Sequence, residues 1–318
     1  MFNVQKYIKI LMKKILLILI VFSALLRFDI FSQNDVQISN FMFSKLWYNP
    51  AFAGSNKTTI NALILARQQW VGFETAPATQ IFELDTYFKK FGGIGLSIIN
   101  DKLGYEKSIS PKIMYSYQKQ VSEKSFISAG IGLGAINKSL DGTKYIYENK
   151  DITDPNGIYD IENEIEPELD FGLTFTNQKF TLGLSSTHIT KSNKNASFIK
   201  IPRHYYFYAD YNIKMNNKVN IIPSFYIKSN KVITHYEINT NVIFAKKFRA
   251  GLSYRLSESV IGLLGMNITP NIKIGYSYDF DVGVIEKYSS GSHEIFLICS
   301  FNKPYKPYIY YKTPRLFN

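Results

Sequence analysis

The side chains that could catalyse a reaction or bind a metal ion are few and scattered. The four histidines lie far apart along the chain: His188, His204, His235 and His293. His293 and Glu294 could act as an acid–base pair, but no nucleophile elbow, P-loop or His pair at helical spacing accompanies them. A lipid-hydrolysing barrel that uses His204 and His293 is therefore the weakest function considered. The sequence predicts no enzyme, no cofactor and no metal site.

Two segments are distinctive in charge rather than in chemistry. Residues 137–168 hold nine acidic groups against three lysines, but the spacing of their oxygen ligands does not match a known calcium loop. Residues 187–204 are basic, with Lys191, Lys194, Lys200 and Arg203. We interpret both segments as hydrated external loops, and the basic one could also contact anionic lipid.

The N-terminus has the pattern of an export signal. Lys13 and Lys14 precede an apolar run over 15–26, and Ser32 offers a small residue before a cleavage point. Twelve apolar residues are too few for a spanning helix, which needs about 20. We therefore predict a signal peptide over 1–32. The exported chain would carry a net charge of +8 rather than +12, without the compact basic run expected of a nucleic-acid-binding protein.

The rest of the chain alternates between apolar and small or polar residues with a period of two. In 126–136, for example, five apolar residues alternate with Ser128 and three glycines. Alternate side chains of a strand face opposite sides, so such segments predict strands with one apolar face. Fourteen segments have this character: 59–67, 80–88, 93–99, 112–119, 126–136, 169–176, 179–186, 205–213, 220–227, 238–244, 248–254, 261–267, 272–278 and 294–301.

The connections between these segments alternate between short and long. The longer ones are expected at 68–79, 100–111, 137–168, 187–204, 228–237 and 279–293. Short periplasmic turns, longer external loops and an even strand number are typical of outer-membrane barrels. The predicted fold is therefore all-β, a transmembrane antiparallel β-barrel of about 14 strands and outer-membrane type, over 59–301. Residues 33–58 would form a periplasmic lead-in, and the Lys/Pro/Tyr-rich residues 302–318 a periplasmic tail.

Four sequence phrases are more specific than a generic barrel. They read YNPAFAG at 48–54, RQQWVGF at 67–73, GGIGLSIINDKLG at 92–104 and SGSHE at 290–294. In this order they resemble the PorP/SprF family of the type IX secretion system, found in Bacteroidota, over about residues 35–301. The tail beyond the last strand departs from the family pattern, which puts the position of the usual C-terminal assembly signal in doubt.

The resemblance implies an outer-membrane protein that works with the secretion and gliding machinery. Such a barrel would help export or anchor one large, adhesin-like surface protein encoded nearby. Its partners would be the periplasmic ring proteins, the translocon, the co-encoded adhesin and outer-membrane lipid. The alternative that the sequence leaves open is a porin or transporter for a small solute.

The candidate partner-binding or structural residues come mainly from these phrases. They are Tyr48, Asn49, Pro50, Gly54, Arg67, Gln68, Gln69, Trp70, Gly72, Phe73, Asn100, Asp101, His204, Ser292, His293 and Glu294.

Several of these residues have a physical interpretation. Pro50 and Gly54 would shape the lead-in, which could alternatively plug the lumen or dock a partner. We interpret Trp70 and Phe73 as part of an aromatic girdle at the membrane surface, with a partner-binding patch as the alternative. Arg67 could form an ion pair with Glu74.

Overall fold

The computed structural model describes residues 35–145, 159–190, 201–282 and 284–303. Within these residues, no helix has both the length and the apolar character needed to cross a membrane. The predicted signal peptide lies outside the described residues, as do the tail from residue 304 and the central parts of the acidic and basic loops.

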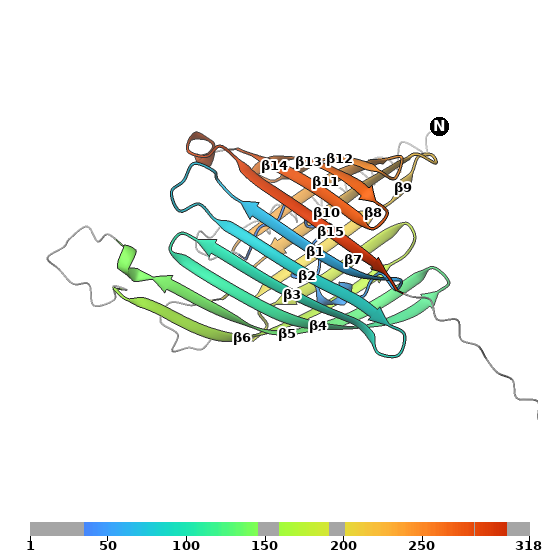
Figure 1. Ribbon diagram of the computed structural model, residues 1–318, viewed down its shortest axis with the longest axis horizontal. Coiled ribbons are helices and arrows are strands. Elements are labelled where there is room, and N and C mark those ends of the chain that lie inside the picture. The colour runs from blue at the N-terminus through green and yellow to red at the C-terminus, as the bar shows by residue number, and fades with distance from the viewer. Residues whose placement is uncertain (1–34, 146–158, 191–200, 283, 304–318) are drawn as a thin grey trace, which may run out of the picture.

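One closed antiparallel sheet forms the whole wall (Figure 1). Its strands are β1 (Thr59–Gln68), β2 (Ala78–Phe88), β3 (Gly92–Leu103), β4 (Glu106–Ser122), β5 (Ser125–Asp141), β6 (Ile161–Thr176), β7 (Phe180–Thr187), β8 (His204–Tyr211), β9 (Ile213–Lys214), β10 (Val219–Ser229), β11 (Thr234–Phe244), β12 (Phe248–Arg255), β13 (Ser259–Thr269), β14 (Ile272–Asp281) and β15 (Ser292–Asn302). The short β9 continues β8 along the same edge of β10, so the wall has fourteen strand positions. The predicted barrel of about 14 strands is confirmed.

The first and last strands close the barrel. β1 pairs with β15 from Thr59 opposite Asn302 to Gln68 opposite His293. Alternate residues along each strand face lipid or lumen, as in β13, where Leu264 is 63% exposed and its neighbour Leu263 only 3%. The apolar outer face and polar inner positions explain the period of two in the sequence.

Several strands are longer than the sequence pattern indicated. β3 and β4 are joined by residues 104–105 alone, and β10 and β11 by 230–233. The long loops predicted at 100–111 and 228–237 were therefore wrong, and the acidic segment 137–168 is partly β5 and β6. Backbone hydrogen bonds between strands form in water as well as in lipid. The sheet therefore continues beyond the membrane through polar residues such as Lys102 and Lys107.

The two ends of the barrel differ in the length of their connections. One end carries short turns such as 89–91, 123–124, 177–179, 245–247 and 270–271. The other carries the longer segments 69–77, 142–160, 188–203 and 282–291, together with the short turns 104–105, 230–233 and 256–258 (Figure 1). We assign the second end to the outside of the cell, because periplasmic turns of outer-membrane barrels are short.

Residues 35–58 lie inside the barrel rather than beside it. They run from the external end, where Asp35 contacts the first residue of β8, to the periplasmic end, where Thr58 accepts a hydrogen bond from Lys303. Phe41 and Tyr48 of this segment are fully buried. The predicted periplasmic lead-in is therefore corrected to a luminal plug, the alternative that the motif had left open. We call residues 35–58 the plug.

Candidate functional site

The centre of the plug is the YNPAFAG motif. Asn49 caps the short 3₁₀ helix Pro50–Phe52, and its Oδ1 accepts a hydrogen bond of 3.0 Å from the Ala51 amide. The other side-chain atom, Nδ2, donates to the carbonyls of Leu173 and Leu184 in the wall at 3.4 and 3.3 Å. One asparagine thus shapes the plug and attaches it to β6 and β7.

Glycines on the inner face of the wall make room for this motif. Gly130 of β5 and Gly172 of β6 face each other in register. A β-carbon at Gly130 would collide with the backbone of Pro50 and Ala51, and one at Gly172 would collide with the Asn49 side chain. The motif can lie against the wall because these positions lack side chains.

Aromatic rings fill the remaining space around the motif. Phe41 stacks on Tyr226 of β10 with ring centroids 4.7 Å apart. The rings of Trp47 and Tyr48 each have their centroid 5.6 Å from that of Tyr206 on β8. Large aromatic rings bury much apolar area and pack in defined geometries, so they hold the plug and leave little open space at its level.

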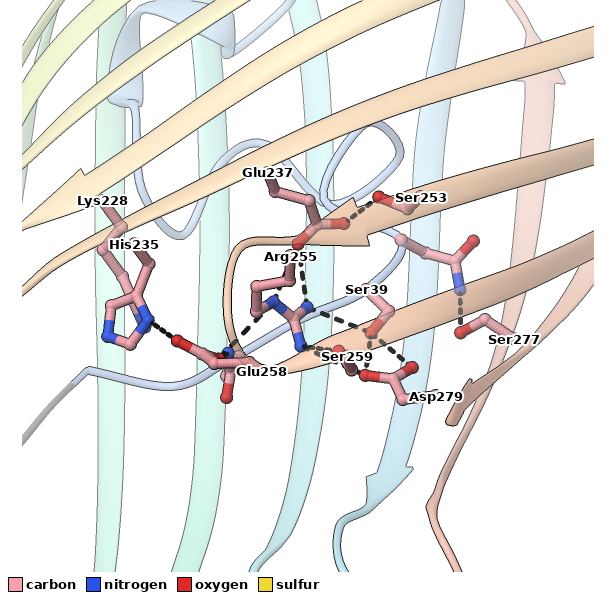
Figure 2. Close-up of polar contacts among 12 residues, drawn as sticks. Ser39, Lys228, His235, Glu237, Ser253, Arg255, Glu258, Ser259, Ser277 and Asp279 are labelled. Carbon is pink, nitrogen blue, oxygen red and sulfur yellow. Dashed lines mark hydrogen bonds and ion pairs between the residues drawn. The ribbon is translucent and has the colours of Figure 1, made fainter. Parts of the chain in front are cut away.

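A network of buried charges surrounds Ser39 of the plug (Figure 2). Arg67 forms ion pairs with Asp279 at 2.8 Å and with Glu294 at 3.3 Å. Arg255 shares Asp279 at 3.2 Å and pairs with Glu237 at 2.9 Å. Arg67 therefore pairs with β14 and β15, not with Glu74 as considered from the sequence.

Carboxylates of the wall also bind the plug backbone. Glu294 accepts hydrogen bonds from the amides of Ser39 and Asn40 at 2.9 and 2.7 Å, and the Ser39 hydroxyl donates to Asp279 at 2.8 Å. Glu83 of β2 accepts from the Trp47 amide at 3.0 Å. Charge-assisted hydrogen bonds are among the stronger ones. Glu294 and Glu83 thus pair amides of the plug, and Glu294 and Asp279 also balance the charge of Arg67.

At the external end, the beginning of the plug meets two histidines. His188 Nε2 lies 3.4 Å from Asp35 Oδ2, and His204 Nε2 accepts a hydrogen bond of 3.2 Å from the Asp35 amide. Burial opposes charge on His188, but Asp35 and Glu168 raise its pKa to about 9. Although burial raises the pKa of Asp35, the hydrogen bond and charge of His188 bring it well below its ordinary value.

A cavity of about 750 Å³ opens beside the external end of the plug. Its lining includes Gln69, Trp70, Asp101, His235, Glu258 and Ser292, together with the external face of the charge network. We call this cavity the external vestibule. Its mixed charges and hydrogen-bonding groups are suited to polar ligands or to a segment of polypeptide.

The structure brings most of the sequence-predicted residues to the plug or the vestibule. Gln69 donates to Gln37 of the plug at 3.4 Å, and the Trp70 amide donates to Ser292 at 3.1 Å. Trp70 lines the vestibule, whereas Phe73 is exposed in 69–77.

The other predicted residues occupy different places. Asp101 lines the vestibule and accepts from Thr79, while Asn100 is exposed and donates to Gln80. Gln68 ends β1, Gly72 has a φ of 113°, and Gly54 donates to Asp85 near the periplasmic end. His293 faces outward, against Tyr276 at 2.6 Å, so it lies away from the lumen although Glu294 faces the plug.

Sequence reasoning did not single out several residues that contact the plug or that contact its binding partners. They are Ser39, Glu83, Glu168, Glu237, Arg255 and Asp279. Five of them are charged residues at inward positions of the observed strands, but only Glu83 lies within a predicted segment. The other four lie just beyond the ends of predicted segments, where the alternation of apolar residues no longer marked the strand.

Comparison with known proteins identifies the family. Residues 30–299 match the family described as type IX secretion system membrane protein PorP/SprF. The chain belongs to the PorP/SprF family. This PorP/SprF protein is a type IX secretion membrane component of the outer membrane, and its family and fold favour a non-catalytic role. A search of functionally curated proteins gives no match.

Solved structures share the fold of this PorP/SprF barrel. The toluene transporter TbuX of Ralstonia pickettii has a TM-score of 0.51 and 10% identity, with 86% of this chain and 96% of that chain covered. A deletion mutant of the monoaromatic hydrocarbon channel TodX has a TM-score of 0.50 and 11% identity, with the same coverage. At these identities the likeness shows the barrel fold alone.

Proposed function

We propose that this PorP/SprF barrel helps export or anchor one large, adhesin-like surface protein. It would do so together with the periplasmic ring proteins and the translocon of the type IX system. The observation that carries the proposal is a lumen closed by the chain's own plug, within a protein of a secretion family. A barrel of this kind serves as a docking component rather than as a conduit.

The packing of the plug argues against the solute-channel alternative. Phe41, Trp47 and Tyr48 have at most 1% of their surface exposed. Their rings pack against Tyr226 of β10 and Tyr206 of β8, and the Trp47 amide donates to Glu83 of β2 in another part of the wall. A channel needs a continuous hydrated path, which densely packed aromatic rings do not provide.

The external vestibule supplies a surface on which a partner could dock. It opens on the side of the cell where a surface protein is retained, and its volume falls in the range of about 300–1,000 Å³ that is typical of ligand sites. It therefore suits a short segment of the partner rather than a folded domain.

Deletion of the gene tests the proposal in the host. The expected result is loss of one large surface protein from intact cells, with other cargo of the system still secreted. Complementation with Trp70→Ala should restore less surface display than complementation with Lys246→Ala, an exposed residue at the periplasmic turn 245–247. Unchanged surface proteins together with lost uptake of a solute would instead support the transporter.

A further inference from the structure

Three side chains from separate elements converge where the plug begins. Asp35 opens the plug, His188 follows the last residue of β7, and His204 is the first residue of β8. Candidate ligand atoms of the three residues all lie within 4.8 Å of one another. Among the residues that the structure describes, no other group of three or more His, Cys, Asp or Glu gathers in this way.

One of the distances between these atoms matches that between neighbouring ligands of one small ion. His188 Nε2 and Asp35 Oδ2 are 3.4 Å apart. Ligands at about 2.0–2.1 Å from a tetrahedral zinc ion are themselves about 3.3 Å apart. His188 and His204 are both more than nine-tenths buried, so their nitrogens meet little competing bulk water.

The groups behind these residues fix their orientation. Nδ1 of His188 lies 2.5 Å from Oε1 of Glu168, so the other nitrogen faces Asp35. The Tyr206 hydroxyl donates to Asp35 Oδ2 at 2.5 Å, and Lys228 donates to the Asp35 carbonyl at 2.8 Å. A carboxylate behind a histidine is the usual outer partner of a metal-binding imidazole.

The backbone at His188 has a conformation that few residues adopt. Its φ is +53°, in the left-handed region that is unfavourable for a residue with a β-carbon. Such strain persists where surrounding contacts over-determine it, and it is common at ligand sites. Here the His188 amide donates to Asp170 at 3.0 Å, which holds the backbone in this conformation.

We propose that Asp35, His188 and His204 form a binding site for a transition-metal ion such as Zn²⁺ at the external end of the lumen. Two imidazoles and one carboxylate favour zinc over calcium or magnesium, which prefer oxygen ligands. Three protein ligands leave a fourth position for water or for a group of a partner. The ion would fasten the first residue of the plug to β7 and β8.

The competing account is an ion pair without metal. A protonated His188 between Asp35 and Glu168 makes the same contacts, so loss of stability on mutation does not distinguish the two accounts. Metal binding must therefore be measured directly.

The test uses the full exported chain, folded in detergent micelles and stripped with a chelator. Calorimetric titration with Zn²⁺ should give one site per chain, and Co²⁺ should give the absorption bands of tetrahedral nitrogen–oxygen coordination. His204→Ala should lower the zinc affinity at least about tenfold, a loss typical for a disturbed metal site. His235→Ala is the matched control, because it alters a histidine at the same end of the barrel that pairs with Glu258 instead.

Two outcomes would overturn the proposal. One is wild-type protein that binds no zinc under these conditions. The other is equal zinc binding by wild type, His204→Ala and Asp35→Asn, which would place the metal elsewhere. Asp35→Asn keeps the size of the side chain and guards against a variant that fails to fold. Surface display of the partner protein is not used as a readout, so a failure here leaves the proposed secretion role to its own test.

Discussion

Asn49 of the plug occupies the space that a side chain on Gly172 would need. Its Oδ1 lies closest to that position, while its Nδ2 donates to the carbonyls of Leu173, the next residue of β6, and of Leu184, its partner on β7. Plug and wall are therefore complementary at the level of single atoms, and the lumen is shaped for this particular sequence.

Gly172→Ala should loosen the plug. The added β-carbon has to displace Asn49, and overpacking of this kind costs about 1–3 kcal/mol. We expect lower thermal stability and faster protease cleavage within residues 35–58. Gly262→Ala is the control, since a β-carbon there meets nothing within 4 Å. Equal effects of the two variants would contradict the proposed complementarity.

Arg67→Ala should be among the most destabilising single changes. It removes the cation that Asp279 and Glu294 share and leaves both carboxylates buried. Breaking one partner from a buried pair costs about 3–5 kcal/mol. Urea unfolding in micelles measures the loss, with the exposed Lys246→Ala as the control. A loss of unfolding free energy below about 1 kcal/mol would show that the buried ion pairs of Arg67 stabilise the fold no more than a surface ion pair does.

Acid should weaken the link between the plug and the external rim. Glu258 accepts from Gln37 of the plug at 2.6 Å and from His235. Burial raises the pKa of Glu258, but the hydrogen bond and charge of His235 and the charge of Arg255 bring it to about 2 from an ordinary value of 4.5. Because the folded value is the lower one, this stabilisation is complete above pH 4.5 and is lost as the pH falls to about 2.

Glu258→Gln isolates this contribution. The difference in unfolding free energy between wild type and variant should shrink as the pH falls from 5 to 2. A difference in unfolding free energy that stays constant over that range would show that the negative charge of Glu258 does not contribute to stability. His235 is left unchanged in both proteins.

The full chain should conduct poorly in a planar bilayer. Removal of residues 35–54 takes away the rings that pack across the lumen, including Phe41, Trp47 and Tyr48, and should produce stable openings. The same current from both proteins would mean that the plug does not block the barrel. Circular dichroism of the shortened chain checks that the wall still forms.

The sequence was informative about the wall because alternation is a local property. All fourteen predicted segments lie on observed strands, since a period of two follows directly from one face in lipid and one in the lumen. Strand ends were less predictable. Beyond the membrane the same ladder continues through polar residues such as Lys107, where the alternation of apolar residues no longer marks it.

The plug and its contacts could not be predicted in the same way. Residues 35–58 lack a period, and their burial depends on residues far along the chain, such as Asp279 and Glu294. His188 and His204 are neighbours only because the β7–β8 register sets Thr187 opposite His204. What the sequence did contain was a clue in the inward glycines of 126–136, which make space for another part of the chain.

The pairing of β1 with β15 dictates an order of assembly. Residues 35–58 are synthesised before any strand, yet the carboxylate that binds Ser39 and Asn40 belongs to the last strand. Until Ser292–Asn302 is available, the sheet has two free edges, and Ser39 and Asn40 lack the carboxylate that binds their amides. Closure of the barrel and completion of the plug contacts therefore take place together, in the last step of folding, when β15 pairs with β1.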